Sequence, residues 1–271
     1  MPYGIQQPSV SAQVNALERD LGVILYERRP FKLTSASEEL FKFVEPFFGK
    51  FAEVRERLQG AAHIRIGASP IVLRDYLSPV ISSVQRQFPR MSMILRAMNQ
   101  PDLIAAMERD ELDILISLIP DNLSPSICTM EIMDLPLILL VLKKSGIKSA
   151  GELWKIGCTT PPLISLGPSE LISQRFQQAL ANLGVSWPPR IEMDSLDLIE
   201  KYVEDGYGVG LSVRLPNKKP SSKIRVLELA DFPAVKLALL YRRGPESNIR
   251  DAFSDRIKRE AQRFIAATKR N

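Results

Sequence analysis

The sequence has few of the residues that catalysis and metal binding use most. Among 271 residues there is one histidine, His63, and there are two cysteines, Cys128 and Cys158. The cysteines are not in a C-x-x-C spacing, so we interpret them as buried thiols in a reducing compartment. A histidine-containing triad or a zinc site would have to be built around His63, which stands where a linker is expected. We therefore expect a structural histidine, no metal and no cofactor.

Long apolar runs are also missing from the sequence. No stretch of about 18 apolar residues occurs, so we expect no transmembrane helix and no membrane partner. The first ten residues, MPYGIQQPSV, lack a basic segment followed by an apolar one and do not resemble a secretory signal. The apolar content of 45% still allows a sizeable core, and the length allows about two domains. We expect a cytoplasmic protein.

The net charge of +5 permits a nucleic-acid partner without indicating one. The excess lies at the C-terminus, where Arg242 to Asn271 contain nine basic and four acidic residues. We interpret this segment as the solvated face of a terminal helix and keep a nucleic-acid contact as the alternative.

A helix is predicted over Gln7–Leu21 because apolar residues recur there on one face. Pro8 suits the first turn, where its missing N–H costs nothing, and Gly22 suits the C-terminal cap. Periodicity alone predicts an amphipathic helix and no DNA contact. The residues on its apolar face are Val10, Val14, Leu17 and Leu21.

The order of motifs after this helix is more specific. In IQQPSVSAQVNALERDLGVILYERRPFKLTSASEEL, the helix carries Leu17-Glu18 near its end and is followed by a Leu21-Gly22 turn. A short strand from Val23 to Arg28 and a wing that closes at Leu33-Thr34 come next. This order resembles the recognition helix and wing of the LysR-type transcription regulators, over about thirty residues.

The resemblance implies promoter or operator DNA as a partner. In that family two helices precede the recognition helix, whereas this chain begins at Met1 inside the corresponding turn. We therefore expect residues 1–33 to form an N-terminally truncated winged helix-turn-helix that binds DNA weakly and mostly electrostatically. The implied groove-facing residues are Gln7, Pro8, Ser11 and Gln13, and the implied wing residues near phosphates are Arg28, Arg29 and Lys32.

Residues 34–62 show a second, strongly apolar helical pattern. In the family it resembles, this is the linker helix that pairs between subunits, so we expect a homodimer or homotetramer. Packing of the stripe against the chain's own second domain is the alternative. The stripe consists of Leu40, Phe43, Val44, Phe47, Phe48, Phe51, Val54 and Leu58.

From residue 63 to 271 strands and helices alternate, which predicts a parallel sheet covered by helices. We expect an α/β effector-binding domain of two lobes, with a periplasmic-binding-protein-like (type II) fold. Lobe I should span about 63–141 and 232–271, and lobe II about 142–231. One helix is predicted to continue from the turn at Ser69 to Pro89. The family resemblance extends here more loosely, through IGAS, Glu111-Leu112-Asp113 and EDGYGVG at 204–210.

The glycines Gly206, Gly208 and Gly210 resemble a dinucleotide-binding fingerprint only in spacing. They follow a helix and lead into a strand, which is the reverse of the context that such a site needs. We interpret them as structural.

An effector is expected between the lobes, outside the carboxyl ends of the strands. Two facing helix N-termini there would suit an anion, most simply a carboxylate. The alternative is that Ser69 and Ser169 only cap their helices. The candidates are Ala68, Ser69, Asn99, Gln100 and Ser117 in lobe I, and Ser165, Gly167 and Ser169 in lobe II.

These patterns favour a transcription regulator that senses a small, anionic metabolite. The alternative is a solute-binding protein of a transport system, which would share the two lobes but should carry a signal peptide and no helix-turn-helix. We do not expect an enzyme, because the sequence has no identifiable nucleophile–base pair; a carboxylate pair brought together by folding is the remaining possibility.

Overall fold

The computed structural model describes residues 7–28, 31–44, 63–155, 161–244 and 247–268. The chain divides into two units, Met1–Ala62 and His63–Asn271. No helix in these described ranges combines the length and the apolar character needed to cross a bilayer.

The first unit contains helix α1 (Gln7–Leu21), the antiparallel hairpin of β1 (Tyr26–Arg28) and β2 (Phe31–Leu33), and a helix that begins at residue 35. Helix α1 ends at Gly22, whose φ of 68° is left-handed. The N–H of Val23 then donates to the carbonyl of Glu18 at 3.2 Å. This is the Schellman arrangement that suits a glycine one residue past the helix.

Two side chains connect α1 and the second helix to the wing. The Glu18 carboxylate accepts the N–H of Leu25 at 2.7 Å and that of Tyr26 at 3.4 Å. The Thr34 hydroxyl donates to the carbonyl of Ile24 at 2.7 Å. The Leu-Glu and Leu-Thr motifs therefore have a physical role, because they hold the hairpin against both helices.

The apolar stripes of this unit are not buried within the described residues. On α1, Leu17 is 41% and Leu21 48% exposed, and Phe43 on the next helix is 82% exposed. The expected linker helix is described only to residue 44. Its predicted stripe residues Phe47, Phe48, Phe51, Val54 and Leu58 lie outside the described residues.

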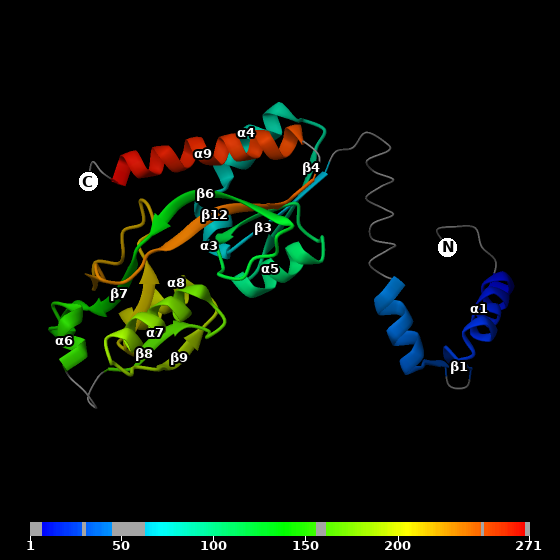
Figure 1. Ribbon diagram of the computed structural model, residues 1–271, viewed down its shortest axis with the longest axis horizontal. Helices are drawn as coiled ribbons and strands as arrows, with labels where there is room; N and C mark the ends of the chain where they lie inside the picture. Colours follow the sequence, from blue (N-terminus) through cyan, green and yellow to red (C-terminus); the bar gives the residue numbers. More distant parts are fainter. Residues whose placement is uncertain (1–6, 29–30, 45–62, 156–160, 245–246, 269–271) are drawn as a thin grey trace. The chain divides into compact units, whose positions relative to one another are not determined.

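The second unit contains two five-stranded sheets, each the core of one lobe (Figure 1). In the first sheet, order β4-β3-β5-β12-β6, the strands β3, β4 and β5 are parallel, and β12 is antiparallel to β5 and β6. Its strands are β3 (His63–Ala68), β4 (Ser92–Ala97), β5 (Ile114–Leu118), β6 (Ile127–Leu135) and β12 (Val235–Arg242).

Helices cover both faces of the first sheet, which explains why every residue of β5 is buried. Leu115 packs with Leu103 and Met107 of α5 on one face. On the other side, α4 and α9 lie next to each other (Figure 1). The helices of this lobe are α3 (Pro70–Asp75), α4 (Ser78–Gln87), α5 (Gln100–Glu108) and α9 (Asn248–Thr268).

The second sheet has the order β11-β7-β10-β8-β9. Its strands are β7 (Leu137–Leu142), β8 (Leu163–Leu166), β9 (Pro189–Met193), β10 (Val209–Val213) and β11 (Ile224–Glu228). Its helices are α6 (Ala150–Lys155), α7 (Leu171–Asn182) and α8 (Leu196–Glu204), with a 3₁₀ turn at Lys143–Ser145.

An aromatic cluster fills one side of this lobe. The ring of Phe232 stacks on Trp154 at 6.0 Å and on Phe176 at 5.5 Å, and Trp187 packs beside them. Aromatic pairs at these separations add stability beyond the area that they bury. Phe232 follows β11, so this contact fixes the chain where it returns to the first lobe.

Two sequence expectations need correction. The boundary of lobe I, expected near residue 141, lies at Pro136, because β6 belongs to the first sheet and β7 to the second. The run LPLILLVL contains no turn signal besides its proline, which is why the sequence did not reveal the crossing. The single helix expected before Pro89 is instead α3 and α4, interrupted at Tyr76-Leu77, because Pro79 occupies the first turn of α4.

The Glu111-Leu112-Asp113 motif connects β3 to the start of β5. The Asp113 carboxylate accepts the backbone N–H of Arg65 at 2.7 Å and pairs with its guanidinium at 2.9 Å. Leu112, which is 1% exposed, packs against Gly67. This motif therefore sets the position of β5 next to β3.

The glycines after α8 are structural. Gly206 has a left-handed φ of 85°, which ends the helix. A Cβ on Gly208 would lie 2.1 Å from the carbonyl oxygen of Pro162, and one on Gly210 would lie 2.6 Å from Ile199. Close backbone packing therefore accounts for Gly208 and Gly210 without a nucleotide.

We expect Gly208→Ala to destabilise the second unit by roughly 1–3 kcal/mol, because the new methyl group meets backbone that cannot move aside. Gly167→Ala is the matched control, since a Cβ at Gly167 meets nothing within 4 Å. Urea unfolding followed by circular dichroism measures both. Equal stability of the two variants would contradict the close packing at Gly208.

Candidate ligand-binding cleft

A cleft lies where the two lobes meet, with about 740 Å³ of empty space when the solvent at its open side is included. Its walls come from the ends of β5 and β10, the beginnings of α3, α5 and α8, and the residues around the start of α7. Most of the lining is apolar, as is usual for small-molecule sites. Its polar and charged members are Ser69, Asn99, Gln100, Ser117, Glu170, Asp194 and Ser195.

Gln100, the first residue of α5, joins the two lobes across this cleft. Its backbone N–H donates to Glu170 Oε1 at 3.1 Å, and its side-chain Oε1 accepts the N–H of Leu171 at 3.0 Å. Its Nε2 donates to the carbonyl of Leu118, within its own lobe, at 2.9 Å. The side chain is therefore fixed by one lobe while it binds the other.

Further contacts between the lobes surround the cleft. The Tyr76 hydroxyl donates to the carbonyl of Pro216 at 2.7 Å, and Arg74 of α3 pairs with Asp197 of α8 at 2.8 Å. Arg175 of α7 also pairs with Asp121. These contacts hold the lobes together around the cleft without a ligand.

Ser117 is the most buried hydroxyl that lines the cleft. Its residue is only 7% exposed, and among the described residues its hydroxyl forms no hydrogen bond. The hydroxyl oxygen is not among the fully enclosed atoms that lack a partner, so it is open to the cavity and available to a ligand. Ser69 also forms no capping hydrogen bond, although it stands at the N-cap of α3.

Glu170 has an unfavourable environment for its negative charge. It is partly buried between the lobes, and this burial is the main cause that raises the pKa of its carboxyl. The N–H of Gln100 lowers this pKa, whereas the nearby carboxylates Asp102 and Asp194 raise it further.

The structure brings four of the predicted effector residues together: Ser69, Asn99, Gln100 and Ser117 all line the cleft. Two of these already form hydrogen bonds within the protein. Asn99 caps α5 by accepting the N–H of Asp102, and Gln100 accepts the N–H of Leu171. The other four predicted residues lie outside the described lining. Ala68 is fully buried in β3, Ser165 donates to the carbonyl of Leu166, Gly167 lies in a turn, and Ser169 is exposed.

The expected anion site is not assembled. The N-cap of α7 is Glu170 and not Ser169, and Gln100 already accepts the first N–H of the helix. The lining also contains two carboxylates, Glu170 and Asp194, and within the described residues it has no Lys, Arg or His. An anion would therefore meet like charge, and the prediction of an anionic effector has no support from this lining.

The sequence reasoning missed Glu170, Asp194 and Ser195. Asp194 and Ser195 stand between the strand β9 and the helix α8, which is the same strand-to-helix signal that identified Ser69. Applying that signal to every crossover would have found them. Glu170 carried no signal of its own, because its position depends on contact with the other lobe.

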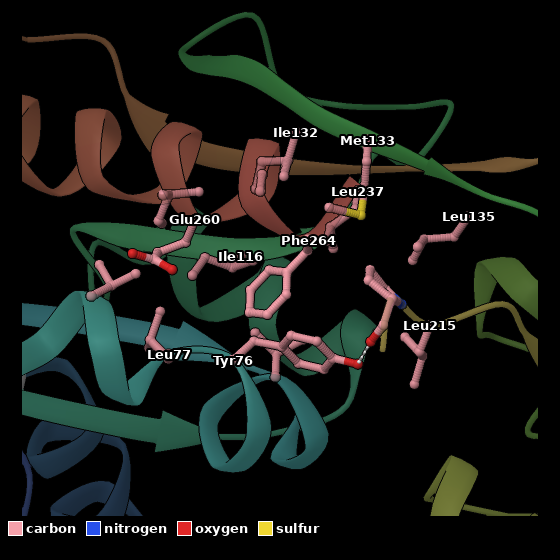
Figure 2. Close-up of a pocket in the computed structure, with 15 residues that line it drawn as sticks. Tyr76, Leu77, Ile116, Ile132, Met133, Leu135, Leu215, Leu237, Glu260 and Phe264 are labelled. Carbon is pink, nitrogen blue, oxygen red and sulfur yellow. Dashed lines mark hydrogen bonds between the residues drawn. The ribbon is translucent and has the colours of Figure 1, made fainter. Parts of the chain in front are cut away.

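A second cavity lies among β6, α3, α4 and α9 of the first lobe and is bordered by Leu215 and Pro216 of the second (Figure 2). Its empty space is about 590 Å³ when the solvent at its open side is included, and its lining is almost entirely apolar. The rings of Tyr76 and Phe264 meet edge to face there, at 5.3 Å. The Tyr76 hydroxyl is committed to Pro216, and burial raises its pKa to about 12. This cavity therefore has fewer available hydrogen-bonding groups for a polar metabolite than the cleft has.

Part of the expected DNA-binding surface can be described. Ser11 and Gln13 are exposed on α1, and Lys32 is exposed on β2. Gln7 and Pro8 lie in the first turn of α1, and Arg28 ends β1, but Arg29 lies outside the described residues. In the described part of the chain, no group of three or more His, Cys, Asp or Glu could hold a metal ion.

Comparison with known families agrees with this architecture. The family model described as LysR substrate binding domain matches residues 58–262. The model described as bacterial regulatory helix-turn-helix protein, lysR family, matches residues 3–38.

The chain belongs to the LysR family of transcription regulators.

LysR-type relatives and structures extend over most of the chain. The hydrogen peroxide-inducible genes activator of Pectobacterium carotovorum is 22% identical, over 96% of this chain and 90% of that protein. The RuBisCO operon transcriptional regulator of Allochromatium vinosum is 22% identical, over 96% and 89%.

Solved LysR-type structures show the same fold. Full-length CbnR in complex with its target DNA has a TM-score of 0.68 at 15% identity, covering 94% of this chain and 91% of that one. A LysR-family protein from Pseudomonas aeruginosa has a TM-score of 0.60 at 21% identity, covering 94% and 90%. The two-lobed α/β fold is therefore confirmed, and members of this family are regulators and not enzymes.

We expect Glu170→Gln to raise the melting temperature of this LysR-type chain at pH 7. Because the folded-state pKa lies above the unfolded value, Glu170 costs stability as the pH rises through that folded pKa, and the cost is absent in acid. Glutamine keeps an acceptor for the Gln100 N–H and removes the charge.

Differential scanning fluorimetry between pH 4 and pH 8 checks this prediction, with Glu192→Gln on exposed β9 as the control for net charge. The difference from wild type should shrink as the pH falls towards the unfolded-state value. An unchanged or lower melting temperature at pH 7 would contradict the role given to burial.

Proposed function

We propose that this LysR-type regulator contacts promoter DNA through α1 and its wing and binds a small-molecule effector in the cleft between its lobes. Three functional segments follow: a DNA-binding segment with the recognition helix and wing at 1–33, a dimerising linker helix at 34–62 and the effector-binding domain at 63–271. We further propose that it acts in the cytoplasm as a homodimer or homotetramer.

The DNA part of the proposal is supported by the geometry around Glu18. Its carboxylate fixes the β1–β2 hairpin relative to α1, so the helix and the wing form one surface. Ser11, Gln13 and Lys32 are exposed on these elements. Short polar side chains suit base edges, and Lys32 suits a phosphate.

The effector part is carried by one observation: the residue Ser117 is buried, and its hydroxyl lines a cavity between the two lobes without a hydrogen bond to a described residue. The names of relatives do not supply the effector, since one refers to peroxide-inducible genes and another to a RuBisCO operon. The transport alternative is unsupported, because residues 3–38 match a helix-turn-helix family.

We expect Lys32→Glu to weaken DNA binding and to reduce the salt dependence by about one phosphate contact. Fluorescence anisotropy with the DNA upstream of the chain's own gene, between 50 and 200 mM salt as typical conditions, measures both. Lys144→Glu is the matched control, since Lys144 is exposed in the second unit. An equal loss of DNA affinity in the two variants would show that the wing does not contact DNA as proposed.

We expect Ser117→Ala to abolish or weaken the response to an effector by roughly tenfold while leaving stability nearly unchanged, because the hydroxyl has no partner to lose. A metabolite library screened by thermal shift identifies the binders, and calorimetry with Ser117→Ala and Ser82→Ala ranks them. Ser82 is exposed on α4, away from the cleft. Binders that lose the same affinity in both variants, or none in either, would place the effector site elsewhere.

A further inference from the structure

The charged residues that line the cleft are all acidic among those described. Glu170 and Asp194 are its charged lining residues, and among the described lining residues there is no Lys, Arg or His. The two carboxylates influence each other, because Asp194 contributes to the raised pKa of Glu170. They therefore belong to one electrostatic environment.

Asp197, which follows the lining residue Leu196, has two cationic partners, whereas Glu170 and Asp194 have none among the described residues. Asp197 pairs with Arg74 at 2.8 Å and with Lys218 at 2.6 Å. Within the described residues, neither Glu170 nor Asp194 forms an ion pair. A partly buried carboxylate without a counter-charge is destabilised, and a cation brought close to it removes that cost.

A second observation at the same cavity indicates a ligand. Ser117 is more than nine-tenths buried and lines the cleft with an uncommitted hydroxyl. The rest of the lining is largely apolar, with Ile71 and Leu103 in the first lobe and Leu196 in the second. The cavity thus combines a negative end, an available hydroxyl and apolar walls.

We propose that the effector is a small cation, an amine or guanidinium compound whose positive group binds Glu170 and Asp194 and whose apolar body fills the rest of the cleft. This inference rests on the proposed function of the cleft as the effector site. Glu170 and Asp194 lie in the second lobe and Ser117 lies in the first, so such a ligand contacts both lobes. It replaces the anion that the sequence alone predicted.

The test compares probes that share one body and differ in charge. Isothermal titration calorimetry of the full chain uses 2-phenylethylamine, 3-phenylpropanoate and 2-phenylethanol, and a second set uses putrescine, agmatine and succinate. We expect at least one amine or guanidinium probe to bind and neither carboxylate to bind. Because Asp194 is exposed, added salt should weaken the binding.

Charge-neutralising variants locate the binding. Glu170→Gln should lower the affinity for the amine by roughly tenfold, as expected for the loss of a hydrogen bond to a charged group. Asp194→Asn should weaken it several-fold, since its exposure screens the charge. Asp255→Asn, which makes the same change in net charge on exposed α9, should leave the affinity unchanged.

Three outcomes would overturn the inference. They are failure of every cationic probe, binding of a carboxylate probe in the cleft, and cation binding that neither Glu170→Gln nor Asp194→Asn weakens. If Ser117→Ala weakens the binding of a carboxylate or neutral compound, the proposal of a cationic effector is wrong, but the cleft remains supported as the effector site. If no compound's binding depends on Ser117, the proposed effector function of the cleft fails as well.

Discussion

Gln100 makes three hydrogen bonds, and the geometry of the cleft depends on them. Its amide nitrogen is held by Leu118 in its own lobe, while its amide oxygen and backbone N–H bind Leu171 and Glu170 in the other. A buried amide that is bonded at both its nitrogen and its oxygen is held in one orientation, and an unpaired one is costly, so this arrangement favours one separation of α5 from α7. The cavity that contains Ser117 exists at that separation.

The same contact decides the electrostatics of the cleft. Glu170 binds Gln100 with one carboxylate oxygen and is desolvated between the lobes as a result. Its charge is therefore more unfavourable there than at an exposed position, and a cationic partner gains from that difference. The apolar cavity beside Tyr76 has a comparable volume, but the Tyr76 hydroxyl is already bonded to Pro216. The two cavities therefore favour different ligands despite their similar size.

In the first unit, one carboxylate has an analogous organising role. Glu18 accepts two backbone N–H groups of the segment that leads into β1, and Thr34 donates to a carbonyl of the same segment. These bonds satisfy backbone groups that a three-residue strand pair leaves open. They explain in physical terms what the Leu-Glu and Leu-Thr motifs do beside the wing of this chain, and they give Lys32 a defined position relative to α1.

Local interactions determined what the sequence alone could predict. The cap and the apolar period around α1 lie within a few residues of one another, so the bounds Gln7–Leu21 could be predicted from them. The motif order around Glu18 identified the family for the same reason. Among site residues, those at strand ends that feed helices, such as Ser69 and Asn99, were found by a local signal.

Tertiary structure alone decided which of these residues share a cavity. The chain passes from one sheet to the other at Pro136, which is the single turn signal in an otherwise apolar run. Gln100, a candidate ligand contact in the sequence, connects the two lobes. The acidic character of the cleft was also decided by tertiary structure, because the position of Glu170 depends on contact with the other lobe. Such properties arise from residues far apart in sequence, whose proximity depends on burial and long-range pairing and not on local pattern.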